Sequence, residues 1–416
     1  MTSGEKKPPG SKDKGEPGEL ALEYLAECER RGAKPNVLLL KRLDDASDAH
    51  ARGEAIALSC IGSEKETFLH RLRDNDLLAL LQSLKNKGAR VRHLDLSFHC
   101  FGDEIGRIFL DFLSVTQSLE TLRLKSNLIS ERGASKLCDV LANCPSLSLL
   151  DLSQNALGRE GGKAAAVLIG NLKSLRALDL SDCQLHLEAF VHLTTAVQTD
   201  NRSLEILNLA NPAITFNCQH SYHVAGVINL ATNLRQLELA KQSLRDDGVE
   251  ILAPFLQQNK TLKSLGLACN QISWRGAAAL GRVLSCSTPL EFLDLCCNRL
   301  GDYGAECLCP GLESNETLRV LLLRTNGICA KGLEKLTDAL TLNCTLEALS
   351  VAGNSWGSSG VRPLLESGSH FLRVEPLVLD WVLCSIHGEL QAVPNTDCPL
   401  LKRKAAALPA ELEPVN

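Results

Sequence analysis

The chain has 416 residues, a formal net charge of −5 at pH 7 and a hydrophobic content of 44%. A chain of this length can bury a sizeable core, and its slight negative charge gives no sign of binding to nucleic acid or anionic membranes. No apolar run approaches the roughly 20 residues of a transmembrane helix, and the polar start Met1–Lys7 is not a signal peptide. We therefore expect a protein of the cytoplasm and nucleus that is not secreted and keeps its 17 cysteines mainly reduced.

The first 90 residues predict a disordered tail followed by a capping region. Residues 1–18 are rich in Gly, Pro, Lys and Glu, a composition that is typical of disorder. Leu20–Cys28 has helical spacing, Val37–Leu43 predicts a second short helix, and Ile56–Ile61 resembles a degenerate first strand. We expect residues 19–90 to cover the open end of a repeat array.

Between about residue 91 and residue 382, a leucine phrase of the form L-x-x-L-x-L-x-x-N-x-L recurs, almost always 28 residues after the previous copy. Two steps differ, with 29 residues from Leu175 to Leu204 and 30 from Leu204 to Leu234. This period predicts a leucine-rich-repeat solenoid, an α/β horseshoe with parallel strands on its concave face and helices on its convex face. Residues 383–416 follow as a C-terminal cap and tail. The eleven copies begin at Val91, Leu119, Leu147, Leu175, Leu204, Leu234, Leu262, Leu290, Leu318, Leu346 and Val374.

Each copy of the phrase also predicts its own local structure. The alternating leucines form a short strand with its apolar side inward. The asparagine that follows is buried and bonds the main chain of its own turn and of the neighbouring repeat. A glycine 14 residues after the first leucine, as at Gly133 and Gly276, lets the next helix pack closely. Cys183 takes the asparagine position of its repeat, so we expect a small buried thiol there.

The regular 28-residue repeat with a helix resembles the ribonuclease-inhibitor-like class of leucine-rich repeats over residues 91–382. Segments outside the consensus, among them Val37–Leu40, Asn211–Ile214 and Val374–Asp380, are similar to a member of that class linked to germ-cell and stem-cell development. The resemblance implies a non-enzymatic protein of the nucleus, nucleolus and cytoplasm. It implies neither catalytic residues nor a cofactor.

Three short motifs suggest other chemistry, and each has a plainer explanation. Gly353–Gly357 matches the G-x-S-x-G nucleophile elbow, but its second residue is the repeat asparagine and no acid or histidine partner can be placed. Cys218, His220 and His223 could ligate zinc, but no C-x-x-C completes the set, so a surface excursion of the irregular repeat without a metal is favoured. Lys402–Lys404 is a weak nuclear-localisation motif or simply part of a soluble tail.

The residue between the second and third leucines of each phrase should point into the hollow of the horseshoe, because strand side chains alternate. We call this set the concave row. Its first half is mainly acidic, its second half is small or apolar, and Asp182 lies beside it. The acidic half is either a solvated face or a surface for a basic segment of a partner along the first six repeats. The concave row consists of Asp95, Arg123, Asp151, Asp179, Asn208, Glu238, Gly266, Asp294, Leu322, Ser350 and Val378.

A second candidate surface is apolar. Phe292 should point inward from the eighth repeat, and Val320 and Leu322 from the ninth, with Arg324 beside them. Strands in a sheet lie about 4.8 Å apart, so these side chains should be neighbours and could anchor a partner. Trp381 either extends this patch or covers the C-terminal edge.

The leading functional hypothesis is a non-enzymatic scaffold that binds a protein partner in its concave face, without nucleic acid or membrane. One alternative is a GTPase-activating protein of the Ran type, a class that uses similar repeats but carries a long acidic tail that this sequence lacks. Another is a structural subunit of cilia or axonemes, in which a solenoid serves as a bracket.

Overall fold

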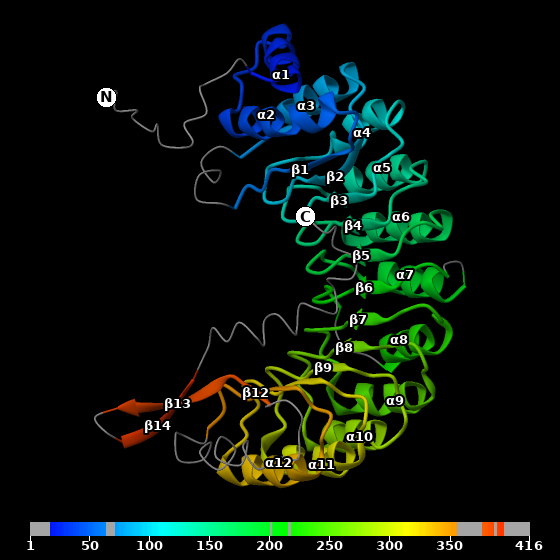
Figure 1. Ribbon diagram of the computed structural model, residues 1–416. Helices are drawn as coiled ribbons and strands as arrows, with labels where there is room; N and C mark the ends of the chain where they lie inside the picture. Colours follow the sequence, from blue (N-terminus) through cyan, green and yellow to red (C-terminus); the bar gives the residue numbers. More distant parts are fainter. Residues whose placement is uncertain are drawn as a thin grey trace, which may run out of the picture.

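The computed structural model shows an arc of repeated strand–helix units with the strands on its inner side and the helices on its outer side (Figure 1). Among the described residues, twelve parallel strands form one open sheet in the order β1 to β12, so each strand pairs with its neighbours in sequence. The predicted solenoid is therefore confirmed. Most of the predicted N-terminal tail, Gly357 and Lys402–Lys404 lie outside the described residues, which are 17–63, 71–199, 202–214, 218–355, 377–386 and 389–394.

The N-terminal region packs three helices and one strand against the start of the array. Both predicted helices and the predicted strand are present, but α2 continues beyond Leu43 because Ser47 extends its buried face and donates a hydrogen bond to the Leu43 carbonyl at 2.7 Å. The elements are α1 (Glu19–Arg30), α2 (Val37–Ala51), β1 (Ile56–Ser59) and α3 (Asp74–Asn86).

The array itself alternates short strands with helices of 9 to 14 residues. The strands are β2 (Val91–Asp95), β3 (Thr121–Arg123), β4 (Leu149–Asp151), β5 (Ala177–Asp179), β6 (Ile206–Asn208), β7 (Gln236–Glu238), β8 (Ser264–Gly266), β9 (Phe292–Asp294), β10 (Val320–Leu322), β11 (Ala348–Ser350) and β12 (Val378–Leu379). The helices are α4 (Ile105–Leu113), α5 (Glu131–Leu141), α6 (Gly158–Asn171), α7 (Leu187–Thr199), α8 (Cys218–Leu230), α9 (Arg245–Gln258), α10 (Trp274–Leu284), α11 (Gly301–Ser314) and α12 (Ala330–Leu342).

The repeat asparagines make the hydrogen bonds that the phrase predicts. The Asn155 amide donates to the carbonyls of Leu124 and Leu152, each at 2.9 Å, and its oxygen accepts from the backbone N–H groups of Asn127 and Ile129, each at 3.2 Å. One buried side chain therefore joins two successive turns. Where the asparagine is replaced, Cys183 is fully buried with its sulfur 3.1 Å from the Leu152 carbonyl oxygen, which confirms its structural role.

The repeat glycines mark places where helices of neighbouring repeats approach closely. A Cβ at Gly133 would lie 2.9 Å from Cα of Asp103, and one at Gly332 would lie 2.9 Å from Cα of Asp302. In both places the aspartate of the preceding repeat accepts a hydrogen bond from the glycine N–H, at 3.2 Å for Gly133 and 3.0 Å for Gly332. Each carboxylate thus caps the start of the next repeat's helix, where N–H groups lack partners within the helix.

The C-terminal end of the sheet departs from the predicted register by two residues. Val378 of β12 pairs with Ala348, so its assignment beside Ser350 in the concave row is wrong, as is the start of the last copy at Val374. Asp380 instead lies beside Ser350 and accepts hydrogen bonds from Ser350 Oγ at 2.6 Å and from the Val351 N–H at 2.9 Å. A buried carboxylate therefore satisfies the last turn, where a further strand would otherwise do so.

A two-stranded antiparallel hairpin, β13 (Trp381–Ile386) and β14 (Glu389–Pro394), follows the sheet directly. Trp381 pairs through its backbone with Pro394, so the end of β14 returns to the edge of the array.

The segment with Cys218, His220 and His223 is not a surface excursion, because it forms the first turns of α8. His220 is fully buried, and its ring lies 4.5 Å from the ring of Phe190. Burial lowers the pKa of His220 to about 4, so the side chain is a neutral core residue at physiological pH.

The register of the core gives a direct test. Leu265 is fully buried in β8, between Leu237 and Leu293 of the adjacent strands. We expect Leu265→Asp to lower the melting temperature by more than about 10 °C, because an unpaired charge enters a core shared by several repeats. Thermal unfolding followed by circular dichroism measures this. Lys263→Asp, which disrupts a surface ion pair, is the control and should lower the melting temperature only slightly. An equal fall in melting temperature for both variants would contradict the register.

Candidate functional site on the concave face

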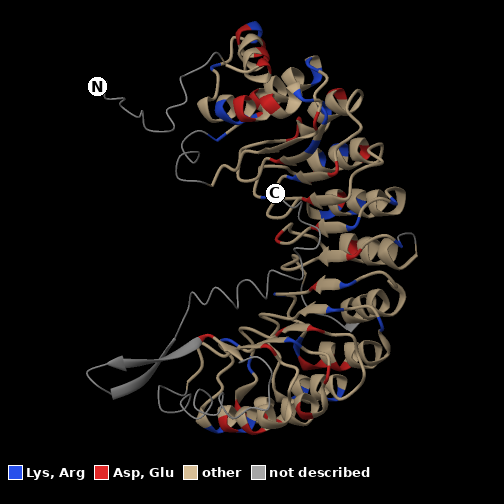
Figure 2. Ribbon diagram, viewed as in Figure 1, with Lys and Arg blue, Asp and Glu red and all other residues tan. Residues whose placement is uncertain are grey.

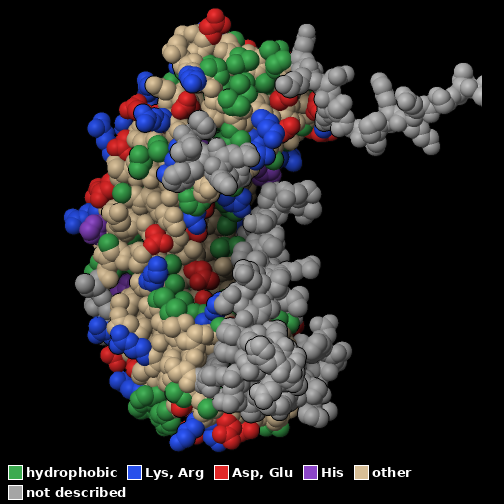
Figure 3. Space-filling view, turned by 90° about the vertical axis from the view of Figure 1, so that its left-hand side faces the viewer, with side chains coloured by type: hydrophobic (Ala, Val, Ile, Leu, Met, Phe, Trp, Pro, Cys, Tyr) green, Lys and Arg blue, Asp and Glu red, His purple; other side chains and the backbone are tan. Residues whose placement is uncertain are grey.

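The strand register brings the acidic half of the concave row together. Asp151 lies beside Asp179, and Glu238 lies beside Gly266, which in turn lies beside Asp294. The four acidic side chains are partly exposed, whereas the leucines that flank them in each strand are buried. Acidic residues lie along the inner side of the arc in Figure 2, and Figure 3 shows acidic and hydrophobic side chains together in the hollow.

The row is less continuous than predicted. Arg123 lies between Asp95 and Asp151 in the register and separates the first carboxylate from the others. Asp182 lies outside the strands, where its carboxylate accepts a hydrogen bond from the Asn211 side chain. The acidic surface therefore spans β4 to β9 rather than the first six repeats.

The aspartates of the row also hold the turns that follow their strands. Asp151 Oδ1 accepts hydrogen bonds from the Ser153 N–H at 2.9 Å and from the Ser153 hydroxyl at 2.6 Å. Asp95 makes the same pair of bonds with Ser97, at 3.1 and 2.7 Å. The D-x-S sequence thus has a local structural role. In Asp151 and Asp95 these bonds use only one carboxylate oxygen and leave the other available to a ligand, whereas the second oxygen of Asp179 accepts a hydrogen bond from the Asn208 side chain at 3.0 Å.

The middle of the row lies in a partly dehydrated surface, where neighbouring acidic groups disfavour a negative charge on Glu238. Burial and the charges of Asp294 and Asp179 raise the pKa of Glu238 to about 8. Burial and the charge of Asp179 likewise raise the pKa of Asp151. A side chain at Gly266 would overlap the Glu238 carboxylate, so this glycine makes room for it. Among the described residues, no ion pair joins a Lys or Arg side chain to these carboxylates.

A depression of about 250 Å³, which we call the hollow pocket, opens between β3 and β7 on this face. Its lining includes the apolar side chains of Leu149 and Ile206 and the carboxylates of Asp151 and Asp179. Leu149 and Ile206 are not part of the concave row, because that row contains only the position between the second and third leucines. Both precede the second leucine of their phrases and face the same hollow, so reading that position as well would have found them.

The predicted apolar cluster forms, but its largest members are covered. Phe292 lies beside Val320 in the register, and they are 7% and 3% exposed. Ala348 completes the cluster, and Leu322 packs against it while remaining partly exposed. The expectation of three apolar groups on an open surface is therefore wrong for Phe292 and Val320. The cluster presents Leu322 to the hollow, and the nearby Arg324 is exposed.

The remaining predicted features do not form a further site within the described chain. Trp381 begins β13, outside the twelve-stranded sheet. Asn354 of the serine motif is a repeat asparagine that donates to the carbonyls of Leu323 and Val351 at 2.9 and 2.7 Å. No group of three or more His, Cys, Asp and Glu side chains could hold a metal ion among the residues described. No described helix is long and apolar enough to cross a membrane.

The chain is similar in part of its sequence to a protein family and in its structure to solved proteins. A family model described as Leucine Rich repeat matches residues 91–107, 143–164, 258–281 and 286–309. Among solved structures, the internalin inlF of Listeria monocytogenes is 17% identical, over 84% of this chain and 94% of that chain, with a TM-score of 0.41. Leiomodin-1 actin-binding site 2 is 20% identical, over 34% of this chain and 80% of that chain, with a TM-score of 0.30. Curated protein sequences contain no significant match. The repeated phrase, the parallel sheet that it forms and the four matched segments together show that the chain folds as a leucine-rich-repeat solenoid.

Proposed function

We propose that this protein is a scaffold whose concave face binds a basic segment of a protein partner across β4 to β9. The observation that carries the proposal is the row of acidic side chains at Asp151, Asp179, Glu238 and Asp294, which faces the hollow. Burial and neighbouring carboxylates of the row raise the pKa of Asp151 and of Glu238. Like charges held together at a partly dehydrated surface are stabilised by an incoming cation. A lysine-rich or arginine-rich segment supplies that charge.

The hollow pocket suits one long basic side chain. Its apolar members, Leu149 and Ile206, can pack against an aliphatic stem, while Asp151 and Asp179 accept hydrogen bonds from the ammonium or guanidinium group at its tip. Farther along the hollow, Leu322 offers an apolar contact and the exposed Arg324 a positive one. The partner segment therefore has basic residues over β4 to β9 and an apolar residue followed by an acidic one over β10.

The proposal for the compartment rests on the family resemblance and on the basic triplet Lys402–Lys404. We propose that the scaffold works in the nucleus, including the nucleolus, and in the cytoplasm, in germ cells and stem cells. A fluorescently tagged chain should then accumulate in nuclei, and changing all three basic residues to Gln should move it to the cytoplasm. An unchanged distribution would show that the triplet is only a soluble tail.

Asp151→Asn tests the charge of the hollow pocket without breaking its turn, because an asparagine oxygen can still accept both Ser153 bonds. We expect the affinity for a short fluorescein-labelled lysine-rich peptide to fall on the order of tenfold, as measured by fluorescence anisotropy. The matched control is Asp95→Asn, which alters the same kind of turn outside the pocket. Equal effects of the two substitutions would refute a specific site at β4 and β5.

The raised pKa of Glu238 makes the free energy of unfolding depend on pH. The folded chain keeps a proton on Glu238 up to about pH 8, whereas the unfolded chain releases it near pH 4.5. The folded state thus binds more protons between these values, so the free energy of unfolding falls as pH rises through this window. Glu238→Gln is neutral at every pH. We expect it to match the wild type near pH 4 and to melt about 2 °C higher at pH 8.5.

Differential scanning calorimetry at the two pH values measures this difference. Glu313→Gln, on the exposed side of α11, is the control and should melt at the wild-type temperature at both pH values. If Glu238→Gln melts at the wild-type temperature at pH 8.5, the carboxylate is not crowded as the structure indicates.

A further inference from the structure

A second set of charged residues follows the edge of the sheet, at the residue after the first leucine of each phrase. Neighbouring members form ion pairs between repeats, such as Arg92 with Glu120 at 3.0 Å and Lys263 with Glu291 at 2.9 Å. The backbone of these positions is itself hydrogen-bonded from one repeat to the next, as in the bond from the Glu120 N–H to the Arg92 carbonyl at 2.8 Å. The edge is therefore a fixed line of charges about 4.8 Å apart.

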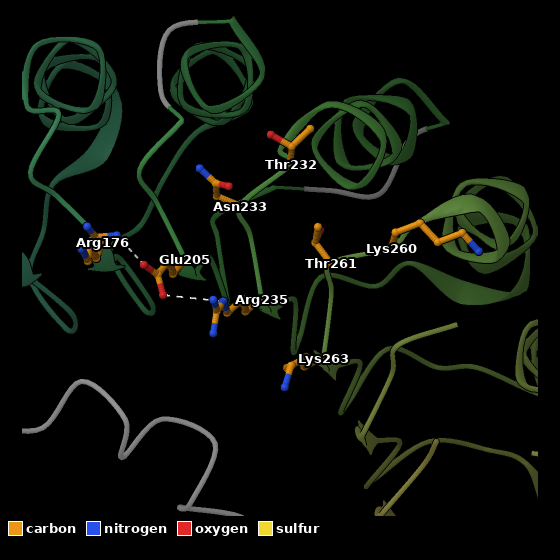
Figure 4. Close-up of a pocket in the computed structure, with 8 residues that line it drawn as sticks. All are labelled: Arg176, Glu205, Thr232, Asn233, Arg235, Lys260, Thr261 and Lys263. Carbon is orange, nitrogen blue, oxygen red and sulfur yellow. Dashed lines mark hydrogen bonds and ion pairs between the residues drawn. The ribbon is translucent and has the colours of Figure 1, made fainter. Parts of the chain in front are cut away.

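The balance of charge breaks down in the middle of this line. Glu205 is shared by two arginines, Arg176 at 2.5 Å and Arg235 at 3.7 Å. Lys263 occupies the next position, and its partner Glu291 is not part of the pocket lining. The neighbouring loop between α9 and β8 adds Lys260, which is exposed. Four cationic side chains and a single carboxylate thus line one open cavity of about 650 Å³, which we call the edge pocket (Figure 4).

The edge pocket lies where the repeat length changes. Its strands belong to the 29-residue and 30-residue steps, and the loop before β7 contributes Thr232 and Asn233, both exposed polar residues. The loop before β8 is held by Asn259, whose side-chain oxygen accepts from the Thr261 N–H at 2.9 Å and whose amide donates to the Ile228 carbonyl at 2.7 Å. The backbone that supports the cations is therefore firmly bonded.

We infer that the edge pocket binds an acidic peptide segment of a protein partner. A carboxylate of such a segment can bridge Arg235 and Lys263, since these side chains come from adjacent strands, and a second carboxylate can reach Arg176. The Thr232 hydroxyl can bond the peptide main chain, and Asn233, whose amide N–H donates to the Arg202 carbonyl, can accept a bond through its side-chain oxygen. This ligand chemistry is opposite to that of the concave face, so the inference is independent of the proposed function.

Two observations favour a peptide over a nucleic acid. The residues that line the edge pocket include no aromatic side chain on which a base could stack. The concave row, which begins only a few residues away along each strand, is acidic and repels a long phosphate backbone. A short acidic peptide segment satisfies the cations without crossing that surface.

Arg235→Glu in the full chain tests the inference, with a short fluorescein-labelled glutamate-rich peptide as the probe. We expect its affinity to fall on the order of tenfold in fluorescence anisotropy. Arg319→Glu is the matched control, because Arg319 occupies the same position of its phrase and pairs with Glu347 at 3.8 Å outside the pocket. This variant should bind like the wild type. Lys263→Gln, a milder change, should weaken binding in the same direction, and circular dichroism confirms that each variant is folded.

The outcomes separate this inference from the concave site. Asp151→Asn should leave binding of the acidic probe unchanged, so a failure at either surface does not affect the other. Equal losses for Arg235→Glu and Arg319→Glu would overturn the inference, since they would show only a general charge effect. It would also be overturned if a single-stranded RNA bound in an Arg235-dependent manner and the acidic peptide did not bind.

Discussion

Each strand of this array ends in a turn whose buried backbone groups find partners only through the next repeat. The repeat asparagines meet that need, as when Asn155 bonds the turns that follow both β3 and β4. A buried amide or carbonyl left unpaired costs about 1–3 kcal/mol, so this bond enforces register from one repeat to the next. At the first turn His99 bonds the main chain in the same way. Its Nδ1 lies 3.2 Å from the Leu72 nitrogen, and its Nε2 lies 2.8 Å from the Cys60 carbonyl oxygen.

Because the register is fixed, equivalent positions of successive repeats form rows across the strands. These rows determine the surface chemistry of the solenoid. One position in each phrase forms the acidic concave row, and another forms the charged edge. Because neighbouring members lie about 4.8 Å apart, like charges raise one another's pKa and opposite charges form ion pairs. Glu238, near other carboxylates, and Glu205, between two arginines, illustrate the two outcomes.

The rows could be predicted from the sequence because a strand has a period of two and the phrase marks its phase. The burial of Phe292 could not be predicted from the sequence, because a local pattern gives the direction of a side chain but not what packs above it. The register of β12 was missed because Leu377 and Leu379 fit the second and third leucines of the phrase, whereas Leu379 pairs with Leu349, the second leucine of the preceding copy. Cys218–His223 misled because its polar residues suggested a loop, whereas burial of His220 against Phe190 stabilises a helix there.

The two charged surfaces belong to the same repeats, and this constrains the partner. Glu205 and Arg235 of the edge pocket directly precede Ile206 and Gln236 of the hollow pocket in the sequence. A bound chain that passes over the edge of β6 and β7 would therefore leave a basic surface and enter an acidic one within a few residues. A partner that used both pockets would need an acidic stretch next to a basic one, in one direction only. Opposite charge on adjacent rows thus gives the scaffold a means of orienting what it binds.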